Sequence, residues 1–180
     1  VLASSAVGRY CRPVVIGDAR VLERAQKITG VRINTQLYTE VPDLPDIPGR
    51  IPVVDLANLD PDEIEVGRAS GSSGKASAEA LAVAVRAALE GRIDAVAYAP
   101  LSKSALVLSG LPFSDELDYF VHLTGWKGNR GQIAVIKNLW TARVTSHTSF
   151  RSVADQITTE KVEMAIDLAY ETLRRAGFSR

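Results

Sequence analysis

The stretch LWTARVTSHTSFR, residues 139–151, alternates apolar and polar side chains before it reaches a histidine. A period of two residues is typical of a β-strand with one covered face. The hydroxyl residues around His147 favour a turn that can also cap a following helix. The stretch therefore predicts a strand over residues 139–146 with His147 at its carboxyl end, which is the edge where open α/β sheets bind their ligands.

The sequence on both sides of this strand predicts further strands and helices in alternation. Residues 131–137 form a second predicted strand, separated from the first by one residue, so we expect a tight hairpin. Upstream, Asp18 can cap a helix over residues 19–29, and Thr158 or Thr159 can cap the last helix. Further strands are predicted over residues 13–17, 31–38, 51–56 and 92–100. This order predicts an α/β fold with a mixed, largely parallel sheet flanked by helices.

The composition excludes several classes of function. Of 180 residues, 46% are apolar and 23% charged, which is enough for one substantial core. Lys plus Arg and Asp plus Glu both number 21, so no net charge favours nucleic acid or an anionic membrane surface. Cys11 is the only cysteine, which excludes a disulfide framework within the chain, and no apolar run approaches the roughly 20 residues that span a bilayer. We therefore expect a single cytoplasmic α/β segment, residues 1–180, with no nucleic-acid or membrane partner.

Two interpretations are open for GRASGSSG, residues 67–74, which precede a helix predicted over residues 75–90. A glycine-rich loop before a helix can cradle a phosphate with its free backbone N–H groups and the helix dipole. The stretch lacks the spacing of a Walker or dinucleotide motif, however, and it does not clearly follow a strand. A connector into a packing helix is the simpler interpretation.

Lys103 lies just after the strand predicted over residues 92–100, at the start of another helix. A lysine there can bind a carboxylate or phosphate or assist proton transfer, although a solvated lysine in a first helical turn would give the same pattern. Asp115 and Glu116 open a further helix, where the helix dipole favours acidic residues, so their default role is structural. His122, inside that helix, is expected to pack or to lie at the surface.

At GLPFSDELDYFVHLTG, residues 110–125, and at VTSHTSFRSVADQITTEKV, residues 144–162, the chain resembles the 4-hydroxythreonine-4-phosphate dehydrogenase family of pyridoxal phosphate biosynthesis. PVVIGDARVLERA, residues 13–25, and RIDAVAYAPLSKSAL, residues 92–106, stand in that family's order. The resemblance covers the whole chain but only the middle of the usual family protein. It implies a fold like that of the isocitrate and isopropylmalate dehydrogenases, incomplete at both ends, without the N-terminal glycine-rich strand and loop and without the C-terminal half.

The resemblance implies a homodimeric, NAD-dependent dehydrogenase that oxidises a phosphorylated four-carbon hydroxy acid, which then decarboxylates. A divalent metal, either zinc, magnesium or cobalt, would polarise the alcohol and stabilise the enolate. Three histidines hold this metal in the family; His147 matches the first, and the other two belong to the missing C-terminal half. Lys103 falls on the lysine of the family's Ala-Pro-Leu-Asn-Lys motif, which implies a catalytic contact with the substrate or a proton relay. Arg151 is expected to anchor a substrate anion, and the resemblance assigns no NAD-binding residue.

Glu116 and Leu117 depart from the family pattern, in which a His-Thr pair at these places contacts the substrate. A histidine can be cationic and donate to a phosphate or carboxylate, whereas Glu116 accepts hydrogen bonds and repels an anion. The resemblance implies 4-phosphohydroxy-L-threonine as the first candidate substrate. A 4-phospho-D-threonate or erythronate-type sugar acid is the alternative suggested by the departure. An alternative from a different class of function is that the chain is a truncated, non-catalytic segment that binds a partner subunit.

Overall fold

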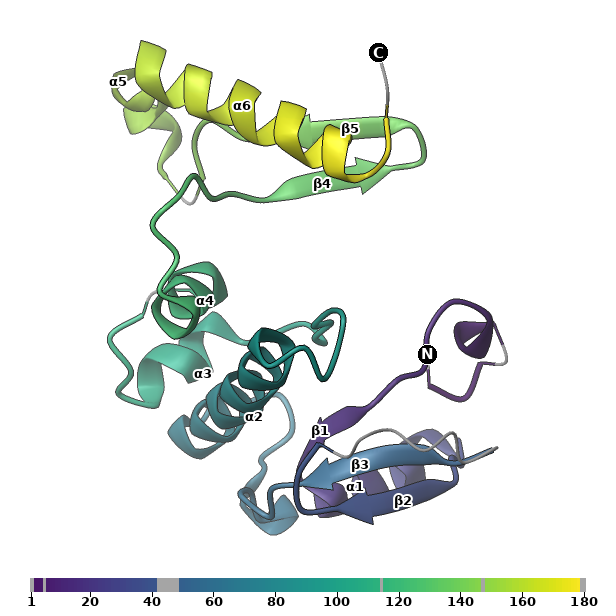
Figure 1. The fold of residues 1–180 in the computed structure, drawn as a ribbon. Coiled ribbons are helices and arrows are strands. Elements are labelled where there is room, and N and C mark those ends of the chain that lie inside the picture. Colours follow the sequence, from purple (N-terminus) through teal and green to yellow (C-terminus); the bar gives the residue numbers. More distant parts are fainter. Residues whose placement is uncertain (1, 5, 42–48, 114, 147, 179–180) are drawn as a thin grey trace. The chain divides into compact units, whose positions relative to one another are not determined.

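The computed structural model describes residues 2–4, 6–41, 49–113, 115–146 and 148–178 (Figure 1). The chain divides into two compact units, Val1–Gly125 and Trp126–Arg180. The first unit contains a parallel sheet with helices beside it, and the second contains a β-hairpin with a long helix. The structure is therefore of the α/β class that the sequence predicts.

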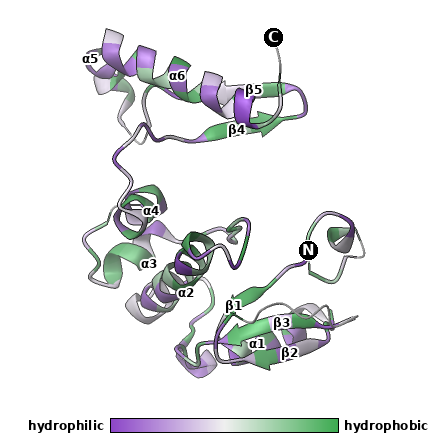
Figure 2. Ribbon diagram, viewed as in Figure 1, coloured by the Kyte–Doolittle hydropathy of each residue, from purple (hydrophilic) through white to green (hydrophobic). Residues whose placement is uncertain are grey.

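The sheet of the first unit has three parallel strands in the order β1-β3-β2. They are β1 (Val15–Gly17), β2 (Thr35–Tyr38) and β3 (Ile51–Asp55). Gly17 pairs with Asp55 in register, so β1 and β3 end side by side. Two valines of the central strand, Val53 and Val54, are 1% and 0% exposed, because a strand with neighbours on both edges and packing partners on both faces has no open side. Figure 2 shows β1 and β3 largely in the hydrophobic colour.

Each helix of the first unit begins at a polar residue whose side chain accepts a hydrogen bond from a backbone N–H of the first turn. These caps are Asp18, Ser70, Ser102 and Asp115. They start α1 (Ala19–Thr29), α2 (Gly71–Leu89), α3 (Lys103–Leu108) and α4 (Glu116–Thr124). Two 3₁₀ turns, η1 (Val7–Arg9) and η2 (Pro61–Glu63), complete the unit. The bounds and the cap of α1 are those predicted from the sequence.

The described residues of the first unit form two hydrophobic cores, and α2 contributes to both. One lies between α2, α3 and α4, where Leu81, Leu106 and Tyr119 are buried together. The other lies between the sheet and α2, where Val54 and Ala87 are buried together. The alanines of α2 allow this helix to approach the sheet on one side and two helices on the other, because they add little bulk beyond the backbone.

Two of the three glycines of the predicted loop over residues 67–74, Gly71 and Gly74, serve helix packing. Gly71 and Gly74 lie in the first turn of α2, so the helix begins four residues earlier than predicted. A Cβ added at Gly74 would lie 1.9 Å from the carbonyl oxygen of Ala105, and one added at Gly71 would lie 2.6 Å from that of Leu108. Only glycine allows α2 and α3 to approach this closely, which accounts for both glycines without a bound phosphate.

The prediction of a strand over residues 92–100 is wrong. None of the described strands pairs with this segment, although Ile93 packs against the second core. A strand is stable only when a neighbouring strand takes up its backbone hydrogen bonds. The apolar pattern of the segment suggested a buried strand, but most of its residues are exposed, Tyr98 to 44%, and the pattern supplied no such neighbour.

The second unit begins with the predicted hairpin, made by β4 (Ile133–Ile136) and β5 (Leu139–Ala142). Its turn takes two residues instead of one, and Lys137 adopts φ 53° there. The strands are shorter than predicted, because Ala142 pairs with Ile133, the first residue of β4, and nothing described lies opposite the residues that follow. Three further elements follow, η3 (Phe150–Ser152), α5 (Val153–Gln156) and α6 (Thr159–Arg175), the last capped by Thr158 as predicted.

The sequence VPDLPDIPGR, residues 41–50, is rich in proline and predicts a loop. Most of it falls on residues 42–48, which lie outside the described residues. Within the described part of the chain, none of the helices is both long enough and apolar enough to cross a membrane.

Candidate functional site

The first unit brings two of the predicted site residues together. Lys103 opens α3 and Glu116 opens α4, and the Lys103 Nζ atom lies 4.0 Å from Glu116 Oε2. The Lys103 side chain is 38% exposed, whereas that of Glu116 is 14% exposed. Glu116 Oε2 is itself buried and has no hydrogen-bond partner in the described part of the chain. The pair is therefore an ion pair at long range, with one carboxylate oxygen that lacks a donor.

Tyr98 adds a phenol to this pair. Burial raises the pKa of Tyr98, and the negative charges of Glu116 and Asp115 raise the pKa further. The tyrosine ring also contacts Phe120, with ring centroids 5.5 Å apart. The phenol is therefore protonated at neutral pH, in the electrostatic field of the carboxylates at the start of α4.

A shallow surface depression of about 450 Å³ opens beside Lys103. It is lined by Lys103, Ser104, Val107 and Leu108, which places the lysine at the boundary between solvent and an apolar wall. Leu117 follows Glu116 on α4 and is half-buried. His122, near the other end of α4, contacts Phe113 with ring centroids 4.9 Å apart, so it has the packing role expected for it.

The remaining predicted site residues belong to the second unit. His147 lies outside the described residues. Arg151 is exposed in η3, and the hydroxyl residues around it hydrogen-bond to one another. Ser152 Oγ lies 2.9 Å from Thr148 Oγ1 and 2.7 Å from Ser149 Oγ. These hydroxyls were predicted to cap a helix; Ser149 does precede η3, but its side chain makes no cap hydrogen bond.

A metal would need more ligands than the described residues provide. No group of three or more His, Cys, Asp or Glu side chains within the described ranges is arranged to hold a metal ion. One histidine cannot hold a divalent metal alone, since catalytic zinc sites use three protein ligands. The described residues therefore do not form a metal site by themselves.

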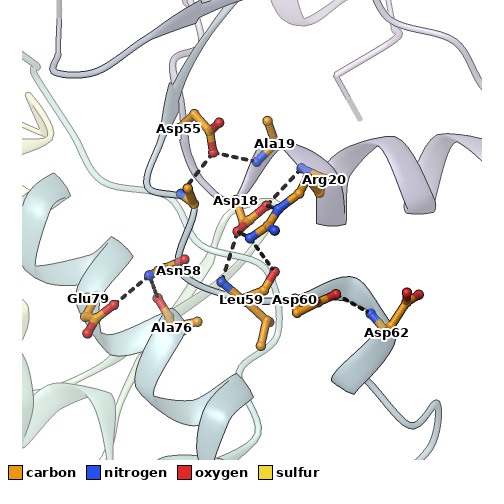
Figure 3. Close-up of polar contacts among 11 residues, drawn as sticks. Asp18, Ala19, Arg20, Asp55, Asn58, Leu59, Asp60, Asp62, Ala76 and Glu79 are labelled. Atoms are coloured by element: carbon orange, nitrogen blue, oxygen red, sulfur yellow. Dashed lines mark hydrogen bonds and ion pairs between the residues drawn. The ribbon is translucent and has the colours of Figure 1, made fainter.

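Sequence reasoning missed a buried polar network at the carboxyl ends of β1 and β3 (Figure 3). Asp18 follows β1, and its carboxylate accepts hydrogen bonds from the Arg20 side chain, the Arg20 backbone N–H and the Leu59 backbone N–H. Asp55 ends β3 and accepts from the backbone N–H groups of Ala19 and Ala57. A usable signal was present, because each acid ends an apolar run, VVIGD and IPVVD.

The network is a scaffold for the loop after β3. The Arg20 guanidinium holds the pKa of Asp18 well below its usual range, and the two backbone donors lower it further against the opposing effect of burial. Asn58 continues the network to α2, where its amide donates to Glu79 Oε2 over 2.7 Å. All these carboxylates are already engaged by protein donors, so the network orders the sheet edge and leaves the Lys103–Glu116 pair as the candidate site.

Comparisons with known proteins agree with this architecture. The sequence profile of the family described as pyridoxal phosphate biosynthetic protein PdxA matches residues 9–180. A protein of Pseudomonas aeruginosa, named provisionally as 4-hydroxythreonine-4-phosphate dehydrogenase 2, is 32% identical over 181 residues, which is 100% of this chain and 53% of that protein. A protein of Oceanobacillus iheyensis, named provisionally as a D-threonate 4-phosphate dehydrogenase, is 35% identical over 92% of this chain and 49% of that protein.

A solved structure gives the same result. The crystal structure of a 4-hydroxythreonine-4-phosphate dehydrogenase from Burkholderia phymatum aligns with a TM-score of 0.81 and 32% sequence identity, over 99% of this chain and 54% of that one. The chain thus spans about half the length of the relatives it matches. The profile match extends over nearly every residue and agrees with the fold, so this chain belongs to the PdxA family of pyridoxal phosphate biosynthetic proteins.

Proposed function

We propose that the protein containing this chain is an NAD-dependent, divalent-metal-assisted dehydrogenase that oxidises a phosphorylated four-carbon hydroxy acid, which then loses carbon dioxide. The observation that carries the proposal is the family match over residues 9–180. The named relatives support it, because they are dehydrogenases of two such acids, 4-hydroxythreonine 4-phosphate and D-threonate 4-phosphate. The chain matches only about half of each, so the activity is proposed for the whole protein.

Each predicted site residue has a role in this proposal. Lys103 contacts the substrate or relays a proton, for which its partial exposure beside the depression is suitable. Glu116 and Leu117 contact the substrate next to Lys103. Arg151 binds an anionic group of the substrate through its exposed guanidinium. His147 is one ligand of the metal, whose other ligands lie outside this chain. NAD accepts the hydride, and the protein orients the reacting groups.

The proposal extends to the setting of the reaction. We propose a homodimer in the cytoplasm. The second unit leaves many large apolar side chains exposed, among them Ile136, Leu139 and Ile166, which are all more than half exposed. Exposed apolar side chains of this kind favour burial against further residues of the full-length protein or against a second copy of it, which supports the proposed dimer.

Steady-state kinetics of the full-length protein test the proposal. The protein is assayed with NAD and, in turn, zinc, magnesium and cobalt, on 4-phosphohydroxy-L-threonine, 4-phospho-D-threonate and 4-phosphoerythronate. We expect the protein to form NADH with at least one of the three acids. This NADH formation should depend on the added metal. A folded protein that turns over none of the three acids would contradict the proposal and favour a non-catalytic role.

A further inference from the structure

The loop from Thr148 to Gln156 in the second unit covers polar side chains and exposes its largest apolar one. Thr148, Ser152 and Gln156 are half-buried, whereas Phe150 is 97% exposed and Arg151 is also exposed. Burial of apolar side chains is the usual force that holds a chain segment in place, and the largest apolar side chain of this loop contributes little to it. The conformation of the turn at Phe150 and Arg151 therefore depends mainly on hydrogen bonds.

A chain of side-chain hydrogen bonds runs through this loop in one direction. The Gln156 amide donates to Thr148 Oγ1 over 2.6 Å, and Thr148 Oγ1 lies 2.9 Å from Ser152 Oγ. The Ser152 hydroxyl donates to the carbonyl oxygen of Ser149 over 3.1 Å and lies 2.7 Å from Ser149 Oγ. A hydroxyl has one proton, so Ser152, which gives its proton to Ser149, accepts from Thr148. Gln156 is thus the first donor of the chain.

This chain of bonds encloses Arg151. Ser149 and Ser152 flank Phe150 and Arg151, and the Ser152 backbone N–H donates to the Ser149 carbonyl oxygen over 3.0 Å. Gln156 is the last residue of α5, and its bond to Thr148 closes the loop across eight positions of the sequence. A side chain presented from a fixed turn binds a ligand at a lower cost in conformational entropy than one on a loose turn.

We propose that Gln156 is a positioning residue, which acts through Thr148 and Ser152 to hold the turn from which Arg151 binds an anionic group of the substrate. The part played by Arg151 rests on the proposed function. Gln156 does not itself bind the anion in this account. Its loss should therefore weaken anion binding only while Arg151 is present.

A double-mutant cycle in the full-length protein tests this role. Isothermal titration calorimetry gives the dissociation constant of inorganic phosphate, the anionic group that the candidate acids share, for the wild type, Gln156→Leu, Arg151→Ala and the double variant. We expect about tenfold weaker binding in Arg151→Ala and at least about threefold weaker binding in Gln156→Leu. In the Arg151→Ala background, Gln156→Leu should change the constant by less than about 1.5-fold, because the residue that it positions is gone.

Matched variants separate the positioning role from a general loss of structure. Thr148→Val keeps the shape of the side chain and removes its hydroxyl, so it should weaken phosphate binding as Gln156→Leu does, whereas Thr148→Ser should restore the binding. These two variants carry the same test if Gln156→Leu does not fold, as judged by circular dichroism. Gln132→Leu changes an exposed glutamine of the same unit and should bind phosphate as the wild type does.

The results distinguish the positioning role from the proposed function. Wild-type binding by both Gln156→Leu and Thr148→Val would overturn the role of Gln156, even in a protein that forms NADH. Equal losses from Gln156→Leu with and without Arg151, or a wild type that binds no better than Arg151→Ala, would also overturn it, because Gln156 would then not act through Arg151. The expected coupling in a folded protein that turns over none of the candidate acids would support the positioning role and contradict the dehydrogenase.

Discussion

The carboxylate of Asp18 accepts a hydrogen bond from the backbone N–H of Leu59, with Oδ2 and N 2.9 Å apart, although the two residues are 41 positions apart in the chain. This bond joins the start of α1 to the loop that follows β3. The Arg20 guanidinium binds the same carboxylate and also donates to the carbonyl of Leu59. The edge of the sheet is therefore held by a buried charge that is fully paired, and removal of that charge should be costly.

Replacement of Asp18 should destabilise the first unit. Asp18→Ala removes a helix cap and leaves the Leu59 N–H and the Arg20 guanidinium without their acceptor, so we expect a loss of about 2 to 4 kcal/mol in the free energy of unfolding. Urea denaturation followed by circular dichroism measures it. The exposed Asp62→Ala is the control and should cost less than about 1 kcal/mol. Equal losses in the two variants would show that the network contributes nothing.

The same carboxylate should make stability depend on pH. The pKa of Asp18 is lowered in the folded protein, chiefly by the Arg20 side chain. Its contribution is therefore fully present above the unfolded value of about 3.9 and is lost as the pH falls towards and through the folded pKa. We expect the stability difference between the wild type and Asp18→Asn, measured by urea denaturation at pH 7 and pH 3, to shrink at the lower pH. A constant difference would contradict this assignment.

Gly74→Ala should disrupt the packing of α2 on α3. The added Cβ would lie 1.9 Å from the carbonyl oxygen of Ala105, so the helices must separate. The clash outweighs the gain of about 1 kcal/mol in helix propensity, and we expect a net loss of more than about 2 kcal/mol in the free energy of unfolding. Ser72→Ala, on the exposed side of the same turn, should change stability by less than about 0.5 kcal/mol. A stabilised Gly74→Ala would refute the close approach.

Tyr119→Phe tests a single buried hydrogen bond. The Tyr119 hydroxyl donates to the carbonyl oxygen of Ala78 over 3.1 Å, and the tyrosine is buried in the core between α2, α3 and α4. The phenylalanine keeps the ring and loses the bond, so we expect a loss of about 1 kcal/mol from thermal or urea unfolding. Tyr170→Phe, on the exposed face of α6, is the control and should have no measurable effect.

His147→Ala tests the metal assignment. If His147 is one of the ligands, the full-length variant should retain less than about one tenth of the metal that the wild type holds after dialysis, as measured by elemental analysis. His122→Ala is the matched control, because His122 packs against Phe113 in α4. Equal metal content in the wild type and His147→Ala would refute the ligand role.

Local features of the fold were predictable from the sequence, because their physical cause lies within a few residues. Asp18 and Thr158 cap α1 and α6 as predicted, since a cap needs only a side-chain oxygen and the next turn of backbone. The hairpin was predictable for the same reason. The prediction of a strand over residues 92–100 was wrong because a strand also requires a neighbouring strand. The local sequence pattern contains no information about that neighbour.

Long-range relationships within the first unit could not be predicted. The glycines of α2 suggested a phosphate loop, and their actual role depends on carbonyl groups of α3 more than 30 residues away. Lys103 and Glu116 were each identified from the sequence, but the 4.0 Å between their charged atoms depends on how α3 and α4 pack against α2.

The measurement that tests the proposed reaction most directly is the stoichiometry of products from the full-length protein. NADH is followed by absorbance and carbon dioxide is trapped from carboxyl-labelled 4-phospho-D-threonate, in the presence of metal. Oxidation followed by decarboxylation predicts one carbon dioxide released for each NADH formed. NADH without carbon dioxide, or neither product from a folded, metal-loaded protein, would contradict it.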